Sequence, residues 1–224
     1  MNSLHPVLSI GQLLSLMAIC TIASAQLPMP LLNPSFEAGG IPGTASAGTQ
    51  YEVAPTWINW TLGKSTSDNS PEVLRNDDIS RYVRQTAQDG DAYLRLAVYK
   101  NNTWQSIGQE LYEPLTGGKH YSLSLYASLD PEHAARTQVR GKRGVNQGKP
   151  VIIRIRGANK FGEPGRVLAQ TDPIKTIDWS LYFLDLYPKE NYRYLVIEAY
   201  HVPGMSLMYE ARVLIDNVKL AKYF

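Results

Sequence analysis

The feature that most constrains this chain is a two-residue alternation of apolar and polar side chains over several short segments. Tyr121, Leu123 and Leu125, for example, alternate with Ser122 and Ser124. Successive side chains of a β-strand point to opposite faces, so each such segment has one face for a core and one for solvent. Similar β-rich runs occur at residues 81–86, 92–99, 119–128, 151–156, 166–171, 181–187, 192–200 and 211–220.

Turn residues separate these runs, as at 89–91 (DGD), 116–118 (TGG) and 162–165 (GEPG). The 14 Tyr and 4 Trp residues suit pleated sheets, and no long segment shows the 3.6-residue period of a helix. The sequence therefore predicts an all-β fold, a two-sheet antiparallel β-sandwich of the jelly-roll type with about eight to eleven strands.

The N-terminal segment predicts export. Residues 7–22 are apolar and uncharged, and residues 23–25 (ASA) form a small-residue cleavage site, so residues 1–25 are predicted to be a cleaved signal peptide. The remainder, 26–224, is predicted to be a single β-sandwich domain that is secreted, periplasmic or at the cell surface. It holds no cysteine and no second apolar run, which predicts neither disulfides nor a membrane span. A formal net charge of +2 does not favour nucleic acid.

Several short motifs occur in a fixed order along residues 33–220. They are 33–37 (NPSFE), 55–57 (PTW), 88–96 (QDGDAYLRL), 107–111 (IGQEL), 115–124 (LTGGKHYSLS), 178–179 (DW) and 213–220 (VLIDNVKL). This order resembles the galactose-binding-like jelly rolls, especially the non-catalytic carbohydrate-binding modules of bacterial secreted and cell-surface proteins. The resemblance implies a sandwich whose first and last strands lie close together, and a function in binding carbohydrate.

The same resemblance implies one structural calcium ion near the two ends of the domain. Its ligands here would be Glu37, Asp91 and Asp216. Calcium prefers six to eight oxygen ligands, and such an ion would clamp a domain that lacks disulfides. The alternative is that Glu37 caps a turn and Asp216 makes a hydrogen bond at a strand end.

Carbohydrate binders combine aromatic platforms with nearby polar groups, because sugars present apolar C–H faces and hydroxyls. The candidate ligand-binding residues are Trp104, Trp57, Trp60, Tyr93, Tyr126 and Arg154. Trp104 is the preferred platform because it follows the polar residues 101–103. Arg154 belongs to a stretch between Glu132 and Glu163 that has no acidic residue and could bind an acidic polysaccharide. The alternatives are core positions for the aromatic residues and a solvated strand face for the basic ones.

Sequence motifs of catalysis are missing. The chain contains no G-x-S-x-G, no H-E-x-x-H and no Gly-rich phosphate loop, and its carboxylates suggest no particular pair for glycoside hydrolysis. The chain is therefore predicted not to be an enzyme, and its predicted partner is a glycan or cell-envelope polysaccharide. The alternative is a structural or protein-interaction domain of the cell envelope, without sugar binding.

Overall fold

The computed structural model describes residues 25–38, 52–54, 56–61, 70–76, 85–131, 148–205 and 209–224. Outside these residues lie residues 1–24 of the predicted signal peptide, most of the predicted strand at 81–86 and most of the polar insertion at 130–149. Within the described part of the chain, no helix is long and apolar enough to cross a membrane.

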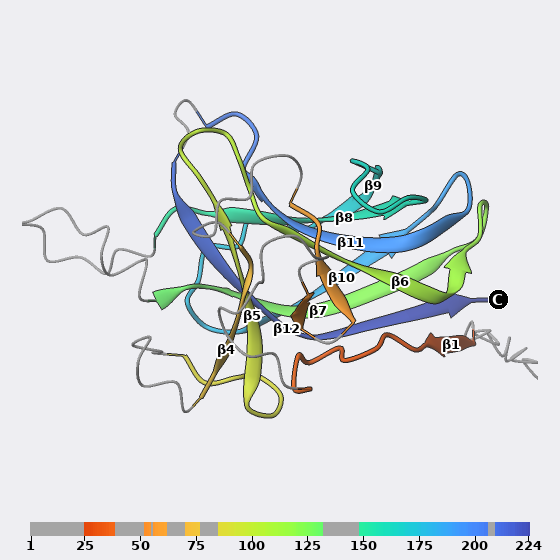
Figure 1. Cartoon of the computed structure of the whole chain (residues 1–224), viewed down its shortest axis with the longest axis horizontal. Coiled ribbons are helices and arrows are strands. Elements are labelled where there is room, and N and C mark those ends of the chain that lie inside the picture. The colour runs from red at the N-terminus through yellow and green to blue at the C-terminus, as the bar shows by residue number, and fades with distance from the viewer. Residues whose placement is uncertain are drawn as a thin grey trace, which may run out of the picture.

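The described residues form twelve strands in two antiparallel sheets, one above the other in Figure 1. Sheet A has the order β10 (Ser180–Leu186), β7 (Tyr121–Leu129), β12 (Ala211–Tyr223), β5 (Ala92–Val98) and β4 (Glu72–Arg75), and β1 (Gln26–Met29) also pairs with β12. Sheet B has the order β2 (Glu52–Ala54), β3 (Trp57–Asn59), β6 (Ser106–Leu115), β11 (Tyr192–His201), β8 (Val151–Ala158) and β9 (Arg166–Gln170). The predicted two-sheet antiparallel sandwich is confirmed.

The alternation of side chains decides which face of each strand is buried. On β8, Ile153 and Ile155 are fully buried between the sheets, whereas Arg154 and Arg156 point to the other face and are partly exposed. β7 follows the same rule in sheet A. The inward side chains of both sheets join in one large hydrophobic cluster. Each outer face carries polar side chains and a much smaller apolar cluster, around Trp60 on sheet B and around Tyr93 on sheet A.

The two ends of the described chain meet on sheet A. β1 pairs with the second half of β12, from Gln26 opposite Tyr223 to Met29 opposite Leu220. The first half of β12 pairs with β5. Between these halves the register with β7 shifts after Asp216, where Asn217 has a φ of 50°. This bulge changes the direction in which the side chains of β12 point. β12 is the last strand, which the family resemblance implied to lie close to the first.

Five of the described strands, β1, β2, β3, β4 and β6, lie outside the predicted runs, and β6 and β1 show why. β6 has the sequence SIGQELYEPL. Its Gly, Pro and three carboxamide or carboxylate side chains do not favour a strand, so local sequence gives little indication of it. β1 contains Pro28, which lacks an amide hydrogen, and pairing with β12 alone leaves this strand at an edge where proline is tolerated. In both strands, pairing with longer neighbours outweighs the local preference.

Candidate functional site

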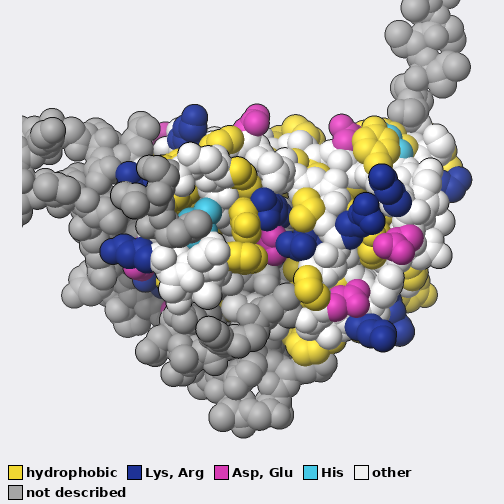
Figure 2. All heavy atoms as spheres, turned by 90° about the horizontal axis from the view of Figure 1, so that it is seen from above, with side chains coloured by type: hydrophobic (Ala, Val, Ile, Leu, Met, Phe, Trp, Pro, Cys, Tyr) yellow, Lys and Arg dark blue, Asp and Glu magenta, His cyan; other side chains and the backbone are white. Residues whose placement is uncertain are grey.

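A groove of about 500 Å³ lies on the outer face of sheet B, and we call it the sheet-B groove. β8 contributes Arg154 and Arg156 to it, and β11 contributes Glu198 and Tyr200. These side chains share one face because they alternate with buried residues along two paired strands. Seen from this side of the molecule, basic side chains gather near the middle of the face, with hydrophobic and a few acidic ones around them (Figure 2).

Trp104 forms a wall of this groove. It lies in the connection between β5 and β6, where it makes an isolated bridge with Val98, and its side chain is half-buried. Its ring meets the Tyr200 ring edge-on, with centroids 4.6 Å apart and planes at 75°. Its indole N–H donates a 3.2 Å hydrogen bond to Glu198 Oε2. Two contacts therefore fix the orientation of an aromatic ring beside the charged groups.

Trp60 also lines the groove and is almost fully buried. Its ring rests on Gly108, where a Cβ atom would come within 2.2 Å of the indole. Its N–H donates to the Glu163 carbonyl at 2.9 Å, and its ring packs against Phe161 and Tyr194. Trp60 therefore supports the groove and offers little free ring surface to a ligand.

The charged groups of the groove form one network. Arg156 donates to Glu198 Oε1 at 2.8 Å, and a guanidinium nitrogen of Arg154 lies 3.9 Å from the same oxygen. Arg154 also stacks over the Tyr200 ring, with its Cζ atom 3.3 Å from the ring centroid. Burial raises the pKa of the Tyr99 phenol on the same groove, so that hydroxyl keeps its proton at neutral pH.

The structure thus brings together three of the predicted ligand-binding residues, Trp104, Trp60 and Arg154. Sequence analysis did not assign Arg156, Glu198 or Tyr200 to the site. The available signal was their period-two spacing on two neighbouring strands, but strand pairing was unknown from the sequence alone.

The other three predicted ligand-binding residues lie elsewhere. Trp57 is fully buried between the sheets, where it contacts Phe36 and donates to the Asn33 carbonyl at 3.0 Å. Tyr93 is 1% exposed and lies on the outer side of sheet A beneath Trp179. Neither ring has a free face, so the prediction that these two residues bind ligand is corrected. Tyr126 is half-buried on β7 of sheet A, away from the groove.

The predicted calcium ligands gather around one turn, residues 88–92, and hold it through its backbone. Glu37 Oε1 accepts the amides of Asp91 and Ala92 at 2.8 and 2.7 Å. Asp216 Oδ2 accepts the amides of residues 88 and 89 at 2.8 and 2.9 Å. Gly90, with a φ of 65°, lets Glu37 approach closely, because a Cβ there would lie 2.4 Å from Oε1.

The oxygens of Glu37 and Asp216 are engaged by backbone amides of the turn. The Asp91 carboxylate accepts from the Asn76 side chain at 3.2 Å. Among the described residues, no three His, Cys, Asp or Glu side chains are grouped as metal ligands. Burial raises the pKa of Asp216 to about 6, partly offset by three backbone amides that stabilise its charged form. Calcium binding stays a prediction of the resemblance.

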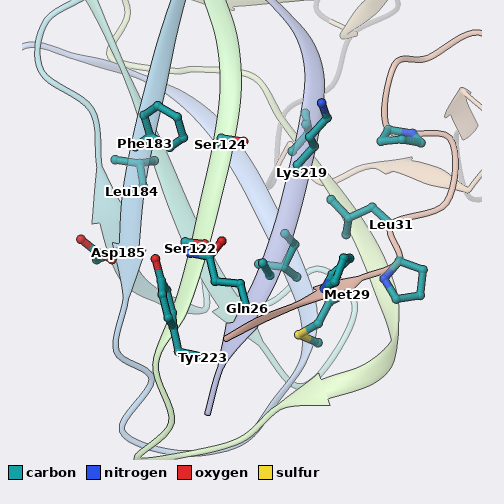
Figure 3. A pocket seen from close by; sticks show the side chains of 16 residues that line it. Gln26, Met29, Leu31, Ser122, Ser124, Phe183, Leu184, Asp185, Lys219 and Tyr223 are labelled. Carbon is teal, nitrogen blue, oxygen red and sulfur yellow. Dashed lines mark hydrogen bonds between the residues drawn. The ribbon is translucent and has the colours of Figure 1, made fainter. Parts of the chain in front are cut away.

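A second hollow, of about 730 Å³, lies on sheet A between β10 and the segment that follows β1 (Figure 3). Ser122 and Ser124 line it from β7, and Phe183, 74% exposed, borders it from β10. None of the predicted ligand-binding residues lines it. Nearby, the His120 ring is stacked between Tyr187 and Tyr223, with centroids 4.5 and 4.0 Å away.

Comparison with known proteins identifies the architecture. No protein-family model matches the chain, and no curated protein matches it in sequence. The Stig cyclase Fisc from Fischerella sp. TAU, solved with (3Z)-3-(1-methyl-2-pyrrolidinylidene)-3H-indole, aligns over 88% of this chain and 98% of its own with a TM-score of 0.50 and 16% identity. An arabinose-bound GH51 α-L-arabinofuranosidase aligns over 87% of this chain with a TM-score of 0.52 and 14% identity, but over only 26% of its own length.

A carbohydrate-binding module, described as CBM4, aligns over 86% of this chain and 99% of its own with a TM-score of 0.46 and 17% identity. At these identities the likeness is one of fold. The comparisons agree with the predicted antiparallel β-sandwich, and the function has to be argued from the groove itself.

Proposed function

We propose that this chain is an exported, non-catalytic module that binds carbohydrate in the sheet-B groove. The observation that carries the proposal is the position of Trp104, whose ring is fixed by Tyr200 and Glu198 at the side of a hollow that also contains Arg154. A sugar ring needs an apolar surface for its C–H face and hydrogen-bonding groups for its hydroxyls. The groove offers both within about 500 Å³.

The charged network supports binding without catalysis. Glu198 is the one carboxylate among the described residues that line the groove, and Arg156 and Trp104 hold it. Glycoside hydrolysis commonly uses two carboxyl groups on opposite sides of the scissile bond. A single carboxylate that is bound by a guanidinium and an indole N–H serves to order the site.

Export and an extracellular location belong to the same proposal, and they are supported by the apolar run at 7–22 and the small residues at 23–25. N-terminal sequencing of the protein from its natural source tests them, with Gln26 as the expected first residue. The proposal includes no calcium ion, because the carboxylates predicted to bind it accept backbone amides.

A glycan array with purified protein tests the binding function. The wild type is expected to bind, and Trp104→Ala is expected to weaken binding at least about tenfold, because burial of an aromatic ring contributes about 1.5–3 kcal/mol. Phe183→Ala is the matched control, since it removes an exposed ring from the opposite sheet. Failure of the wild type to bind any acidic or neutral glycan would contradict the proposal, provided that its melting curve shows a folded protein.

One observation favours a second candidate function, contact with a protein of the cell envelope. Leu181 and Phe183 on the edge strand β10, with Tyr187 after it, are 42%, 74% and 64% exposed. Apolar side chains gathered on a surface often mark a contact with another protein. A silent glycan array together with a partner that is lost on Phe183→Ser would favour this function over sugar binding.

A further inference from the structure

The sheet-B groove has more positive than negative charge. Of the described residues that line it, three are charged: Arg154, Arg156 and Glu198. Two guanidinium groups therefore share one carboxylate. All three are sheltered from water, with 17%, 18% and 6% of their side chains exposed. Screening by solvent is weaker in such a place than on an open surface, so the surplus charge acts strongly on a bound ligand.

The single carboxylate does not satisfy both guanidinium groups. Glu198 is bound closely by Arg156 and by the Trp104 indole, whereas Arg154 lies 3.9 Å away. Arg154 donates instead from Nε to Gln170 at 3.3 Å. The Nε atom of Arg156 is buried and makes no hydrogen bond to the described part of the chain. One positive charge is therefore in surplus in the groove, and the Arg154 guanidinium, which is partly exposed, is the group that a ligand can reach.

We propose that the sheet-B groove selects anionic polysaccharides, and that the carboxylate of a uronic acid residue binds at Arg154. This inference rests on the proposed sugar-binding function and specifies its ligand class. A planar carboxylate matches the fork of guanidinium donors and can accept two parallel hydrogen bonds. Stacking on Tyr200 already orders the Arg154 guanidinium, which lowers the entropy lost when it binds a ligand.

The Trp104 ring and the Arg154 guanidinium are close enough to contact one sugar residue, or two neighbouring residues of the same polysaccharide. Tyr200 touches Trp104 on one side and Arg154 on another, with a centroid distance of 4.6 Å to the indole and 3.3 Å to the guanidinium carbon. A sugar ring that packs on Trp104 therefore places a carboxylate of the same chain near Arg154. Neutral sugars would leave this charge without a counter-charge, so they bind less tightly.

The test compares acidic polysaccharides with the same polymers after methyl esterification. The acidic polymers are polygalacturonate and alginate. Each differs from its own methyl ester, which is its control, in charge and little else. The wild type is expected to bind at least one acidic polymer about tenfold or more tightly than its ester at low salt, a preference of about 1.4 kcal/mol. This preference is expected to shrink as the salt concentration rises.

Two variants assign the preference to the groove. Arg154→Gln is expected to reduce the difference between acid and ester to about twofold or less, and Arg154→Lys to retain part of it, because the charge remains without the planar fork. Lys219→Gln removes one exposed charge from sheet A and is expected to leave the preference unchanged. Melting curves confirm that each variant is folded.

The outcomes separate this inference from the proposed function. If neutral glycans of the array bind through Trp104 but neither acidic polymer is preferred over its ester, the anionic selectivity is overturned and sugar binding stands. An acidic preference that survives Arg154→Gln also overturns the inference, because the selecting charge then lies elsewhere. Absence of binding to all polymers and all array glycans overturns the proposed function itself.

Discussion

The indole N–H of Trp104, in the connection between β5 and β6, donates a 3.2 Å hydrogen bond to Oε2 of Glu198 on β11. The two residues are 94 positions apart in the sequence, and the pairing of β11 with β6 in sheet B, which sets Glu198 opposite Ser106, brings them together. It joins the aromatic wall of the sheet-B groove to its charged network. A change at Glu198 should therefore alter both the stability of the domain and the orientation of the ring.

Glu198→Gln is expected to lower the free energy of unfolding by about 3 kcal/mol, because it leaves two sheltered guanidinium groups without their counter-charge. The matched control is Glu110→Gln, which breaks an exposed ion pair with Arg193 whose side chains are 47% and 63% exposed. That control should cost about 0–1 kcal/mol. Urea unfolding of both variants measures the difference, and equal losses would show that burial does not strengthen the Glu198 pair.

Gly108→Ala is expected to displace the Trp60 ring, since the added Cβ would lie 2.2 Å from it. The clash should cost about 1–3 kcal/mol of stability. Trp60→Leu in the same protein removes the ring that is hit, so the double variant should lose less than the sum of the single variants. A double-mutant cycle by thermal unfolding measures this coupling, and strictly additive losses would place Trp60 away from Gly108.

The raised pKa of Asp216 predicts a stability that falls as the pH rises. A folded-state pKa of about 6, against 3.8 for the unfolded chain, means that the folded protein holds the proton more tightly. The contribution of this group is therefore most favourable below pH 4 and declines by roughly 3 kcal/mol as the pH rises to 6, with no further change above.

Urea unfolding of wild type and Asp216→Asn between pH 4 and pH 7 measures this effect. The wild type minus variant difference is expected to fall with rising pH, while contributions of other carboxylates cancel in the comparison. A difference that instead rises with pH would show that the amides of residues 88, 89 and 217 favour the charged carboxylate more than burial opposes it.

Removal of calcium provides a further test of the turn at residues 88–92. Two amides donate to Glu37 Oε1 and three donate to the oxygens of Asp216, so hydrogen bonds to these two carboxylates hold the turn. A chelator is expected to leave the melting temperature unchanged, and added calcium is expected not to raise it. An increase of several degrees with calcium would restore the ion predicted by the family resemblance, with Glu37→Gln as the variant that should abolish it.

Much of the fold could be predicted from local pattern. The alternation at residues 119–128 and 151–156 identified β7 and β8. The family resemblance implied that the first and last strands lie close together, as β1 and β12 do, although the sequence predicted no strand at residues 26–29. The site was predicted only in part, because the sequence does not show which face of a sheet an aromatic residue occupies. Trp57 and Trp104 look alike in sequence, yet one is sealed between the sheets and the other borders the groove.

The sequence by itself determined that this chain would form a two-layer sandwich. Period-two alternation gives each strand one apolar face, and burying that face against a second sheet removes it from water. Only the tertiary structure decided which outer face would carry a site. Arg154, Arg156 and Glu198 form one network because β8 pairs with β11 in a register that sets residues 154 and 198 opposite each other. Strand pairing is fixed by packing of the whole core, so no local segment encodes it.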